Sequence, residues 1–340
     1  MRLSVIVPAR NEADVLTPCL ESLLAQSIEG FAVGKDWELL MVDDASTDQT
    51  RSIALSFPQV TVTDADPLPA KWTGKANAVW TAARKAQGEW LLFTDADTIH
   101  TAGSLERALH EAEHAKVVML SYSPRQLVDG FWQRALMPLI FSELALTYPP
   151  QKVSDPTSRV AAANGQFLLI ERSAYSQVGG HKAVAGSLLE DVDLALLLKR
   201  KKLPIRFRYA PDALSTRMYR SFGAMIEGWT KNLARLFSFP LLMAAWRAVD
   251  LLLLIGLPLL LWHFFAFPLA RYALAVLWLR VLWRFYSRVA KSNFSALDCA
   301  LSIFALPLFC LLLGRSWWQH TVHSQVAWKG RSYSTQKPGN

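Results

Sequence analysis

The sequence has 340 residues, of which 52% are hydrophobic, and a formal net charge of +8. Its three cysteines do not make a disulfide framework, which excludes a small disulfide-stapled secreted domain. The basic residues crowd near the apolar C-terminal part and at residues 199–202 without interleaved aromatic side chains. Such clusters are typical of cytoplasmic segments that contact anionic headgroups, so we expect a lipid bilayer and no nucleic acid as partner.

The composition changes sharply along the chain. The first 230 residues have the mix of a soluble α/β protein, whereas residues 236–313 are nearly all apolar. We predict a cytoplasmic domain over residues 1–235, an interfacial segment over 236–248, a transmembrane region over 249–314 and a basic tail over 315–340. No apolar signal-peptide stretch precedes the first predicted strand, so we expect the N-terminus to stay in the cytoplasm.

The first two predicted strands each end in a polar turn. Residues 3–7 form an apolar run followed by the turn 8–12, and residues 37–42 are followed by the acidic turn 43–48, with a helix after each turn. This order is typical of the opening of a doubly wound nucleotide-binding sheet. A carboxylate at Asp44 is well placed to contact a nucleoside, although the acids of this turn also suit helix capping.

A third strand is predicted at residues 60–63, followed by a loop rich in helix breakers. The loop ends in Gly74 and Lys75, which open a predicted helix over 76–87. An ammonium near the positive end of a helix is a natural phosphate site. The pattern of a P-loop is absent, so this signal is weak by itself.

The fourth predicted strand, residues 90–93, ends in two carboxylates. Its apolar run shows no alternation, which indicates a strand buried on both faces of a parallel sheet. Asp95 and Asp97 would then lie at the carboxyl edge of the sheet, where they form a possible clamp for a divalent cation. A solvated turn that caps the next helix, predicted at 104–115, is the alternative.

The second half of the soluble part contains four further features of interest. Residues 131–150 suit either an amphipathic element at the membrane interface or an ordinary helix over the sheet. Residues 164–166 form a polar turn that enters a strand, and His181 is either a sugar contact or a structural residue. Glu190 and Asp191 open a helix, where acids serve as caps or supply a catalytic base.

Residues 5–12, 42–48 and 94–97, in this order, resemble the inverting glycosyltransferases of family 2, over roughly residues 3–235. The resemblance implies an α/β fold of the GT-A type and transfer from a nucleoside-diphosphate sugar. It implies that the diphosphate faces Lys75 and that Mg²⁺ or Mn²⁺ is held by Asp95 and Asp97. It also implies that the nucleotide pocket is lined by Pro8, Ala9, Asn11, Glu12 and Asp44.

The same resemblance suggests the catalytic residues. The family's Glu-Asp motif matches Glu190 and Asp191, which implies Asp191 as the general base with Glu190 as its positioning neighbour, and Asp193 as the fallback. The family's Asn-Gly-Gln segment, which borders the sugar and the acceptor, matches the turn that contains Asn164 and Gly165.

Two further stretches resemble the lipid-modifying branch of the family. The Gln-x-x-Arg-Trp motif of processive polysaccharide synthases is absent, and residues 229–232 read Trp-Thr-Lys-Asn instead. Together with the Trp72-x-Gly74-Lys75 spacing, this resembles hopanoid-associated and carotenoid glycosyltransferases. In this reading Lys231 is a second cation on the phosphates.

Three apolar stretches are predicted in the membrane region, at residues 251–267, 270–285 and 296–314. Arg280 and Arg284 interrupt the second, so one or both must snorkel, form an ion pair or face a polar crevice. The third is either a separate crossing or a re-entrant hairpin, which leaves open the side on which the tail lies.

We therefore predict a membrane-anchored inverting glycosyltransferase of a bacterial-type cytoplasmic membrane, with a cytoplasmic catalytic domain. It would move a sugar, expected to be UDP-linked, to a lipid acceptor of the polyprenoid, hopanoid or carotenoid type. A transferase acting on a polyprenyl phosphate and a non-catalytic membrane protein that binds nucleotide sugars are the alternatives.

Overall fold

The computed structural model describes residues 1–323, 325–328 and 331–334, which fall into two compact units. The first unit contains residues 1–127 and 148–218, and the second contains residues 128–147 and 219–340. Part of the predicted basic tail, 315–340, lies outside the described residues. The domain limits expected from the sequence stay a prediction.

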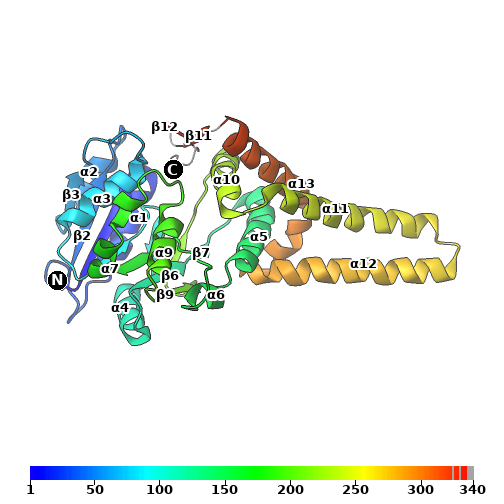
Figure 1. The fold of residues 1–340 in the computed structure, drawn as a ribbon, viewed down its shortest axis with the longest axis horizontal. Helices are drawn as coiled ribbons and strands as arrows, with labels where there is room; N and C mark the ends of the chain where they lie inside the picture. Colours follow the sequence, from blue (N-terminus) through cyan, green and yellow to red (C-terminus); the bar gives the residue numbers. More distant parts are fainter. Residues whose placement is uncertain (324, 329–330, 335–340) are drawn as a thin grey trace. The chain divides into compact units, whose positions relative to one another are not determined.

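The first unit is built on a seven-stranded sheet in the order β3-β2-β1-β4-β8-β6-β9 (Figure 1). Strand β1 pairs in parallel with β2 and β4, whereas β8 is antiparallel to both β4 and β6. Because β8 runs in the opposite direction, its first residues lie beside the carboxyl end of β4. The strands span Leu3–Ala9 (β1), Trp37–Asp43 (β2), Val60–Asp64 (β3), Trp90–Phe93 (β4), Met119–Ser123 (β6), Leu168–Glu171 (β8) and Ile205–Tyr209 (β9).

Helices cover both faces of this sheet, as expected for an α/β fold. Alternate residues of β1 enter different cores, since Val5 and Val7 pack on one face and Ile6 on the other. The first core includes α1 and α4, and the second includes α3 and α9. The helices of this unit are α1 (Ala13–Leu24), α2 (Thr50–Leu55), α3 (Gly74–Lys85), α4 (Ser104–Ala115), α6 (Pro150–Ser154), α7 (Arg172–Gln177), α8 (Gly180–Ala183) and α9 (Glu190–Arg200).

A small three-stranded sheet adjoins the Asp95–Asp97 turn. It has the order β5-β10-β7, with bounds Thr98–His100 (β5), Leu214–Thr216 (β10) and Arg125–Gln126 (β7). Strand β5, which directly follows the turn, is paired with β10 in antiparallel orientation.

The predicted bounds hold for β4 and α4, whereas helix α3 begins earlier than predicted. Helix α3 begins at Gly74 because the Thr73 side chain caps it, accepting from the Ala76 N–H at 3.2 Å. Three residues separate the end of α4 from Met119, the first residue of β6. Lys116, with φ 51°, ends helix α4 in the left-handed conformation, and the turn back to the sheet uses the two following residues.

The second unit is mainly helical. Helix α5 is buried over residues 135–143 and packs against α13. Of the two alternatives for residues 131–150, an amphipathic surface element is therefore wrong for the central part of the helix. The helices are α5 (Gly130–Thr147), α10 (Phe222–Leu236), α11 (Pro240–His263), α12 (Pro268–Val289) and α13 (Ala296–Trp318). Two short strands, β11 (Gln325–Trp328) and β12 (Arg331–Ser334), pair near its end.

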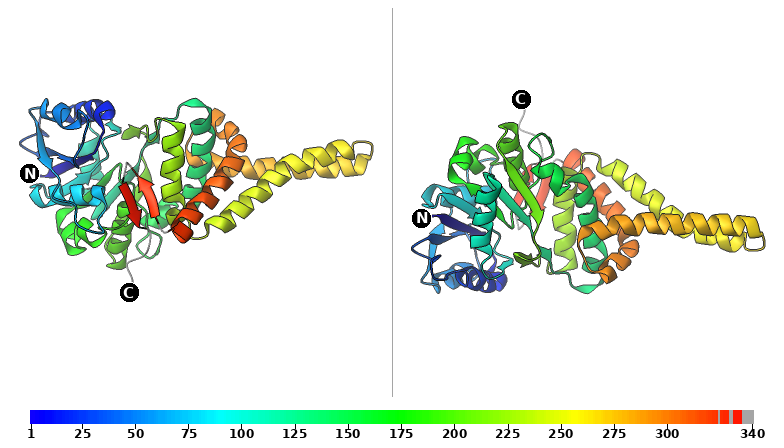
Figure 2. Two further views of the ribbon diagram at one scale, coloured as in Figure 1. Left: turned by 90° about the horizontal axis from the view of Figure 1, so that it is seen from above. Right: turned by 90° about the horizontal axis from the view of Figure 1, so that it is seen from below.

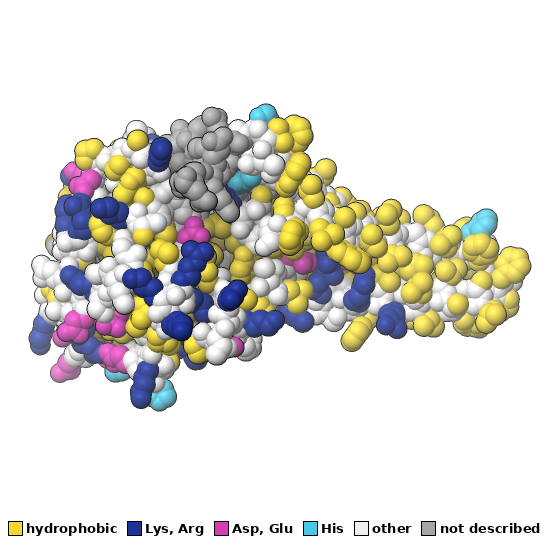
Figure 3. Space-filling view, viewed as in Figure 1, with side chains coloured by type: hydrophobic (Ala, Val, Ile, Leu, Met, Phe, Trp, Pro, Cys, Tyr) yellow, Lys and Arg dark blue, Asp and Glu magenta, His cyan; other side chains and the backbone are white. Residues whose placement is uncertain are grey.

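Helices α11 and α12 form an antiparallel hairpin that extends beyond the other helices of its unit (Figures 1 and 2). Its surface is apolar over most of its length (Figure 3). Several large side chains along it are 65% to 85% exposed: Leu252, Leu259, Trp262, Leu269, Val276 and Trp283. By length and composition, two helical stretches among the described residues could cross a membrane, Pro240–His263 and Ala296–His323.

An ionic cluster lies where the hairpin joins the rest of this unit. Asp250 of α11 contacts Arg247 and Arg284 at 2.5 Å each and Arg288 at 3.0 Å. Glu143 of α5 lies 3.5 Å from Arg247 and 3.3 Å from Arg288. Arg284 was expected to snorkel, form an ion pair or face a polar crevice, and the structure shows an ion pair with Asp250.

Candidate functional site

The turns after β1 and β2 are tied together by hydrogen bonds. Asn11, in the left-handed conformation with φ 53°, donates its backbone N–H to Ser46 Oγ at 3.1 Å. Its side-chain oxygen accepts from the Thr47 N–H at 2.8 Å, and the Glu12 N–H donates to Thr50 Oγ1 at 2.8 Å. Asn11 therefore shapes this corner of the site through its own backbone and side chain.

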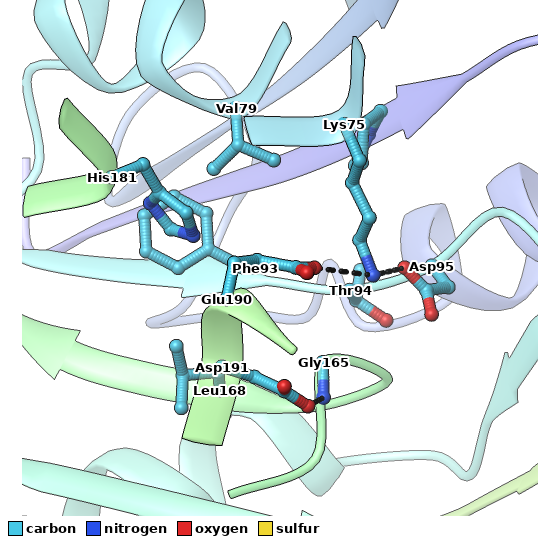
Figure 4. Close-up of a pocket in the computed structure, with 11 residues that line it drawn as sticks. Lys75, Val79, Phe93, Thr94, Asp95, Gly165, Leu168, His181, Glu190 and Asp191 are labelled. Atoms are coloured by element: carbon cyan, nitrogen blue, oxygen red, sulfur yellow. Dashed lines mark hydrogen bonds and ion pairs between the residues drawn. The ribbon is translucent and has the colours of Figure 1, made fainter. Parts of the chain in front are cut away.

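Asp44 lies beside the same turn. Its N–H donates to the Ala9 carbonyl at 2.9 Å, and its carbonyl accepts from the Arg10 guanidinium at 2.8 Å. Asp44 is 7% exposed and does not line the pocket of Figure 4, whereas Pro8 at the end of β1 does. The structure thus brings the residues expected from the first two strands to one edge of the sheet.

Lys75 links two carboxylates that are far apart in the sequence. Its ammonium lies 2.7 Å from Asp95 Oδ1 and 3.1 Å from Glu190 Oε1 (Figure 4). The side chain starts from the first turn of α3, which directs it toward the end of β4. Burial disfavours the charged ammonium, but Asp95, Glu190 and Asp191 outweigh it and raise the pKa of Lys75 well above its usual value.

The Asp95–Asp97 turn is held in place by two threonines. Thr98 Oγ1 donates to the Asp95 carbonyl at 2.7 Å, and Thr94 Oγ1 donates to the Gln166 carbonyl at 2.8 Å. Thr94 N–H also continues the ladder by donating to the Ile6 carbonyl at 3.1 Å. The backbone of this turn is therefore fixed by buried groups beneath it.

Asp95 and Asp97 suit a hard divalent cation. The described residues contain no group of three or more His, Cys, Asp or Glu side chains that could hold a metal by themselves. Mg²⁺ and Mn²⁺ accept carboxylate oxygens, and Mg²⁺ is usually held by one or two carboxylates together with substrate phosphates. The contact between Asp95 and the Lys75 ammonium shows that this oxygen already takes a cationic partner.

Asp191 lies in the first turn of α9. Its Oδ2 accepts from the Gly165 N–H at 2.7 Å, and its Oδ1 accepts from the Val192 N–H at 2.8 Å. Burial, followed by the negative charge of Glu190, raises the pKa of Asp191 to about 7. A carboxylate that gains and loses its proton near neutral pH is suited to general base catalysis.

The turn at residues 164–166 fits closely against these groups. A Cβ at Gly165 would lie 2.9 Å from Lys75 Nζ and 3.5 Å from Asp191 Oδ2, so a larger residue would displace one of them. Asn164 shapes the turn, since its Oδ1 accepts from the Gln166 N–H at 2.9 Å. The side-chain oxygen of Asn164 thus serves the turn itself.

His181 lines the pocket as well (Figure 4). Its Nδ1 is hydrogen-bonded to the Tyr175 hydroxyl at 2.9 Å, and its ring stands edge-on to Phe93 with 4.8 Å between centroids. Burial lowers the pKa of His181 to about 4, so the ring is neutral at physiological pH.

Thr94, which lines the pocket, and Tyr175, which contacts His181, were not predicted as site residues from the sequence. A polar residue directly after the apolar strand was a signal for Thr94, whereas nothing in the sequence pairs Tyr175 with the pocket. Lys231 belongs to α10 in the second unit, where its carbonyl lies 2.7 Å from His320 Nε2. Its expected contact with phosphates stays a prediction.

The profile of the family described as glycosyl transferase family 2 matches residues 4–179 of this sequence. The chain belongs to glycosyltransferase family 2. The family resemblance and the enzyme class predicted from the sequence are thus confirmed.

A staphylococcal and an archaeal glycosyltransferase are similar over nearly the whole chain. The 4,4'-diaponeurosporenoate glycosyltransferase of Staphylococcus aureus (strain USA300) is 25% identical over 348 residues, which cover 98% of this chain and 89% of that protein. A mannosyltransferase from Pyrobaculum calidifontis, solved in complex with GDP-Man and Mn²⁺, has a TM-score of 0.57 and 20% identity, covering 95% of this chain and 87% of that one. This likeness confirms the GT-A type of fold.

Proposed function

We propose that this family 2 enzyme transfers a sugar from a nucleoside-diphosphate sugar, expected to be UDP-linked, to a lipid acceptor by direct displacement with inversion. One observation carries the proposal. Lys75 lies between Asp95 and Glu190, and Asp191, with its pKa raised to about 7, lies on the other side of Gly165. An ammonium suited to bind phosphate, a carboxylate suited to a metal and a carboxylate suited to act as a base thus line one pocket.

The chemistry follows from these groups. Asp191 takes the proton of an acceptor hydroxyl as the oxygen attacks the anomeric carbon. The bond between that carbon and the diphosphate oxygen breaks. The configuration at the anomeric carbon is inverted because the acceptor attacks on the face opposite the leaving group. Lys75 stabilises the negative charge that develops on the departing diphosphate.

Asp95 and Asp97 would hold the divalent ion, Mg²⁺ or Mn²⁺. When bound, the ion neutralises charge on the phosphate oxygens of the leaving group. The Pyrobaculum mannosyltransferase was solved with Mn²⁺ and a nucleotide sugar, which supports this choice. The hydrogen bonds of Thr94 and Thr98 hold the backbone of the turn that carries both carboxylates.

The relative and the hairpin support a lipid acceptor and membrane association. The staphylococcal relative is named for a carotenoid, and the ending of that name denotes a carboxylate. Helices α11 and α12 expose apolar side chains along their length, with arginines at the base of the hairpin (Figure 3). We propose that the hairpin enters the cytoplasmic membrane and that the catalytic unit faces the cytoplasm.

The test is release of nucleoside diphosphate by the detergent-solubilised full chain. UDP- and GDP-sugars are screened with Mn²⁺ or Mg²⁺, with and without a total lipid extract from the source cells. Release that needs metal and rises with lipid is expected. No release with any donor, while UDP with Mn²⁺ still raises the melting temperature, would favour a non-catalytic protein that binds nucleotide sugars.

A further inference from the structure

The cation already present in the site is a side chain of the protein. Lys75 Nζ contacts Asp95 Oδ1 at 2.7 Å and Glu190 Oε1 at 3.1 Å, and these two acids come from the end of β4 and the start of α9 (Figure 4). The ammonium thus joins carboxylates from elements that are about 95 residues apart. It is also close to the Gly165 turn, where an added Cβ would approach Nζ to 2.9 Å.

Lys75 and a divalent ion have to compete for Asp95. An Mg²⁺ ion bound to Asp95 Oδ1 would lie about 2.1 Å from that oxygen, so ammonium and metal would be less than about 5 Å apart if both used it. Like charges repel strongly at that separation in a partly desolvated site. The ammonium therefore has to leave Asp95 before the metal binds well.

A bound diphosphate offers Lys75 a new partner. The phosphate oxygens carry negative charge. The Lys75 ammonium is attached to the first turn of α3 through a flexible four-carbon chain, so it can change partners without moving the helix. Once Lys75 pairs with phosphate, Asp95 is released for the metal, which itself gains phosphate ligands.

We propose that Lys75 is a built-in substitute for the metal, holding Asp95 and Glu190 together in the donor-free enzyme and yielding Asp95 only when a nucleoside diphosphate arrives. This inference rests on the proposed function, since it assumes that Asp95 binds the ion. Its consequence is positive coupling between the two ligands, in which each tightens the binding of the other by the same factor.

Mn²⁺ binding to the full chain in detergent tests this directly, with free Mn²⁺ measured by its electron paramagnetic resonance signal. The wild type should bind Mn²⁺ at least about tenfold more tightly with UDP, or GDP in a parallel series, than without nucleotide. Lys75→Met should tighten nucleotide-free Mn²⁺ binding by about tenfold and reduce the coupling factor to near one. Lys75→Arg keeps a cation and should keep nucleotide-free binding weak.

Lys85→Met is the matched control. Lys85 lies in the last turn of the same helix, and its ammonium contacts Thr63 Oγ1 at 2.6 Å. Its replacement should leave both Mn²⁺ affinities unchanged. Thermal unfolding of each variant checks that the fold is kept, and the arginine variant provides the test if the methionine variant does not fold.

Three results would overturn the inference. The first is that Lys75→Met binds Mn²⁺ without nucleotide no more tightly than the wild type does. The second is that Lys75→Arg binds Mn²⁺ without nucleotide more tightly than the wild type does. The third is that the wild type binds Mn²⁺ equally well with and without nucleotide. Coupling that is present without any sugar transfer to lipid would contradict the proposed function alone. Absence of Mn²⁺ binding under all conditions would contradict both.

Discussion

Replacement of Asp191 by Asn distinguishes an acceptor that reacts through a hydroxyl from one that reacts through a carboxylate. The two oxygens of Asp191 accept from the Gly165 and Val192 N–H groups. Asn keeps one acceptor oxygen, so one N–H loses its partner at a cost of about 1–3 kcal/mol. The pKa of about 7 means that the carboxyl is already partly neutral at neutral pH, so the change in charge adds little. We therefore expect a folded variant of slightly lower melting temperature.

The effect on turnover should be far larger than the effect on folding. Removal of a general base typically lowers the rate by about 10²–10⁴-fold. With a hydroxyl acceptor, kcat for nucleoside diphosphate release should fall within this range, with little change in affinity for the donor. A carboxylate acceptor is already ionised and needs no base, so turnover would then fall only a few-fold.

Asp193 supplies the control, since it lies on the same helix and is exposed. Asp193→Asn should retain turnover within about twofold, because surface substitutions away from special features have small effects. Single-turnover release in the presence of Mn²⁺, acceptor lipid and saturating donor is the appropriate assay. Full activity of Asp191→Asn with an acceptor shown by mass analysis to react at a hydroxyl would refute the assignment, as would loss of activity in Asp193→Asn alone.

Three further predictions follow from the same geometry. Because the base must be unprotonated and the pKa of Asp191 is raised to about 7, kcat/KM should rise with pH up to about 7 and then level off; a flat profile between pH 5.5 and 8 would contradict this role. Asp250→Asn leaves three arginines without their shared carboxylate and should lower the free energy of unfolding by about 3–5 kcal/mol, measured by chemical denaturation in detergent. Leu259→Glu combined with Val276→Glu should reduce sedimentation with phospholipid vesicles several-fold while the melting temperature in detergent stays unchanged, since both side chains are about two-thirds exposed; unchanged sedimentation would exclude the hairpin as the membrane contact.

The sheet and its polar edge could be predicted because burial leaves a strong pattern. A run such as Trp90–Phe93 without alternation is stable only between two covered faces, and the carboxylates after it must then lie at the end of the strand. The helix starting at Gly74 was recognisable from its Gly-Lys opening. Its start was misplaced by two residues because the cap depends on the Thr73 side chain, whose conformation the sequence does not reveal.

The parts that could not be predicted depend on contacts between distant residues. No local pattern shows that Lys75 would lie between Asp95 and Glu190, or that the Tyr175 hydroxyl would meet His181. Arg284 is a further example, since its partner Asp250 precedes it by 34 residues on another helix. Such pairings follow only from the fold. The sequence itself shows that Asp95 follows an apolar run and that Arg284 lies within an apolar stretch.

The exposed apolar hairpin formed by α11 and α12 determines which concentration of the lipid acceptor governs the rate of this enzyme. A protein held at a bilayer by these helices would meet a lipid acceptor by lateral diffusion in two dimensions, while the sugar donor arrives from bulk water. Its rate would then depend on the mole fraction of acceptor among the lipids. Inert phospholipid added at a constant amount of acceptor would slow the reaction by surface dilution, even though the bulk concentration of every reactant stayed the same.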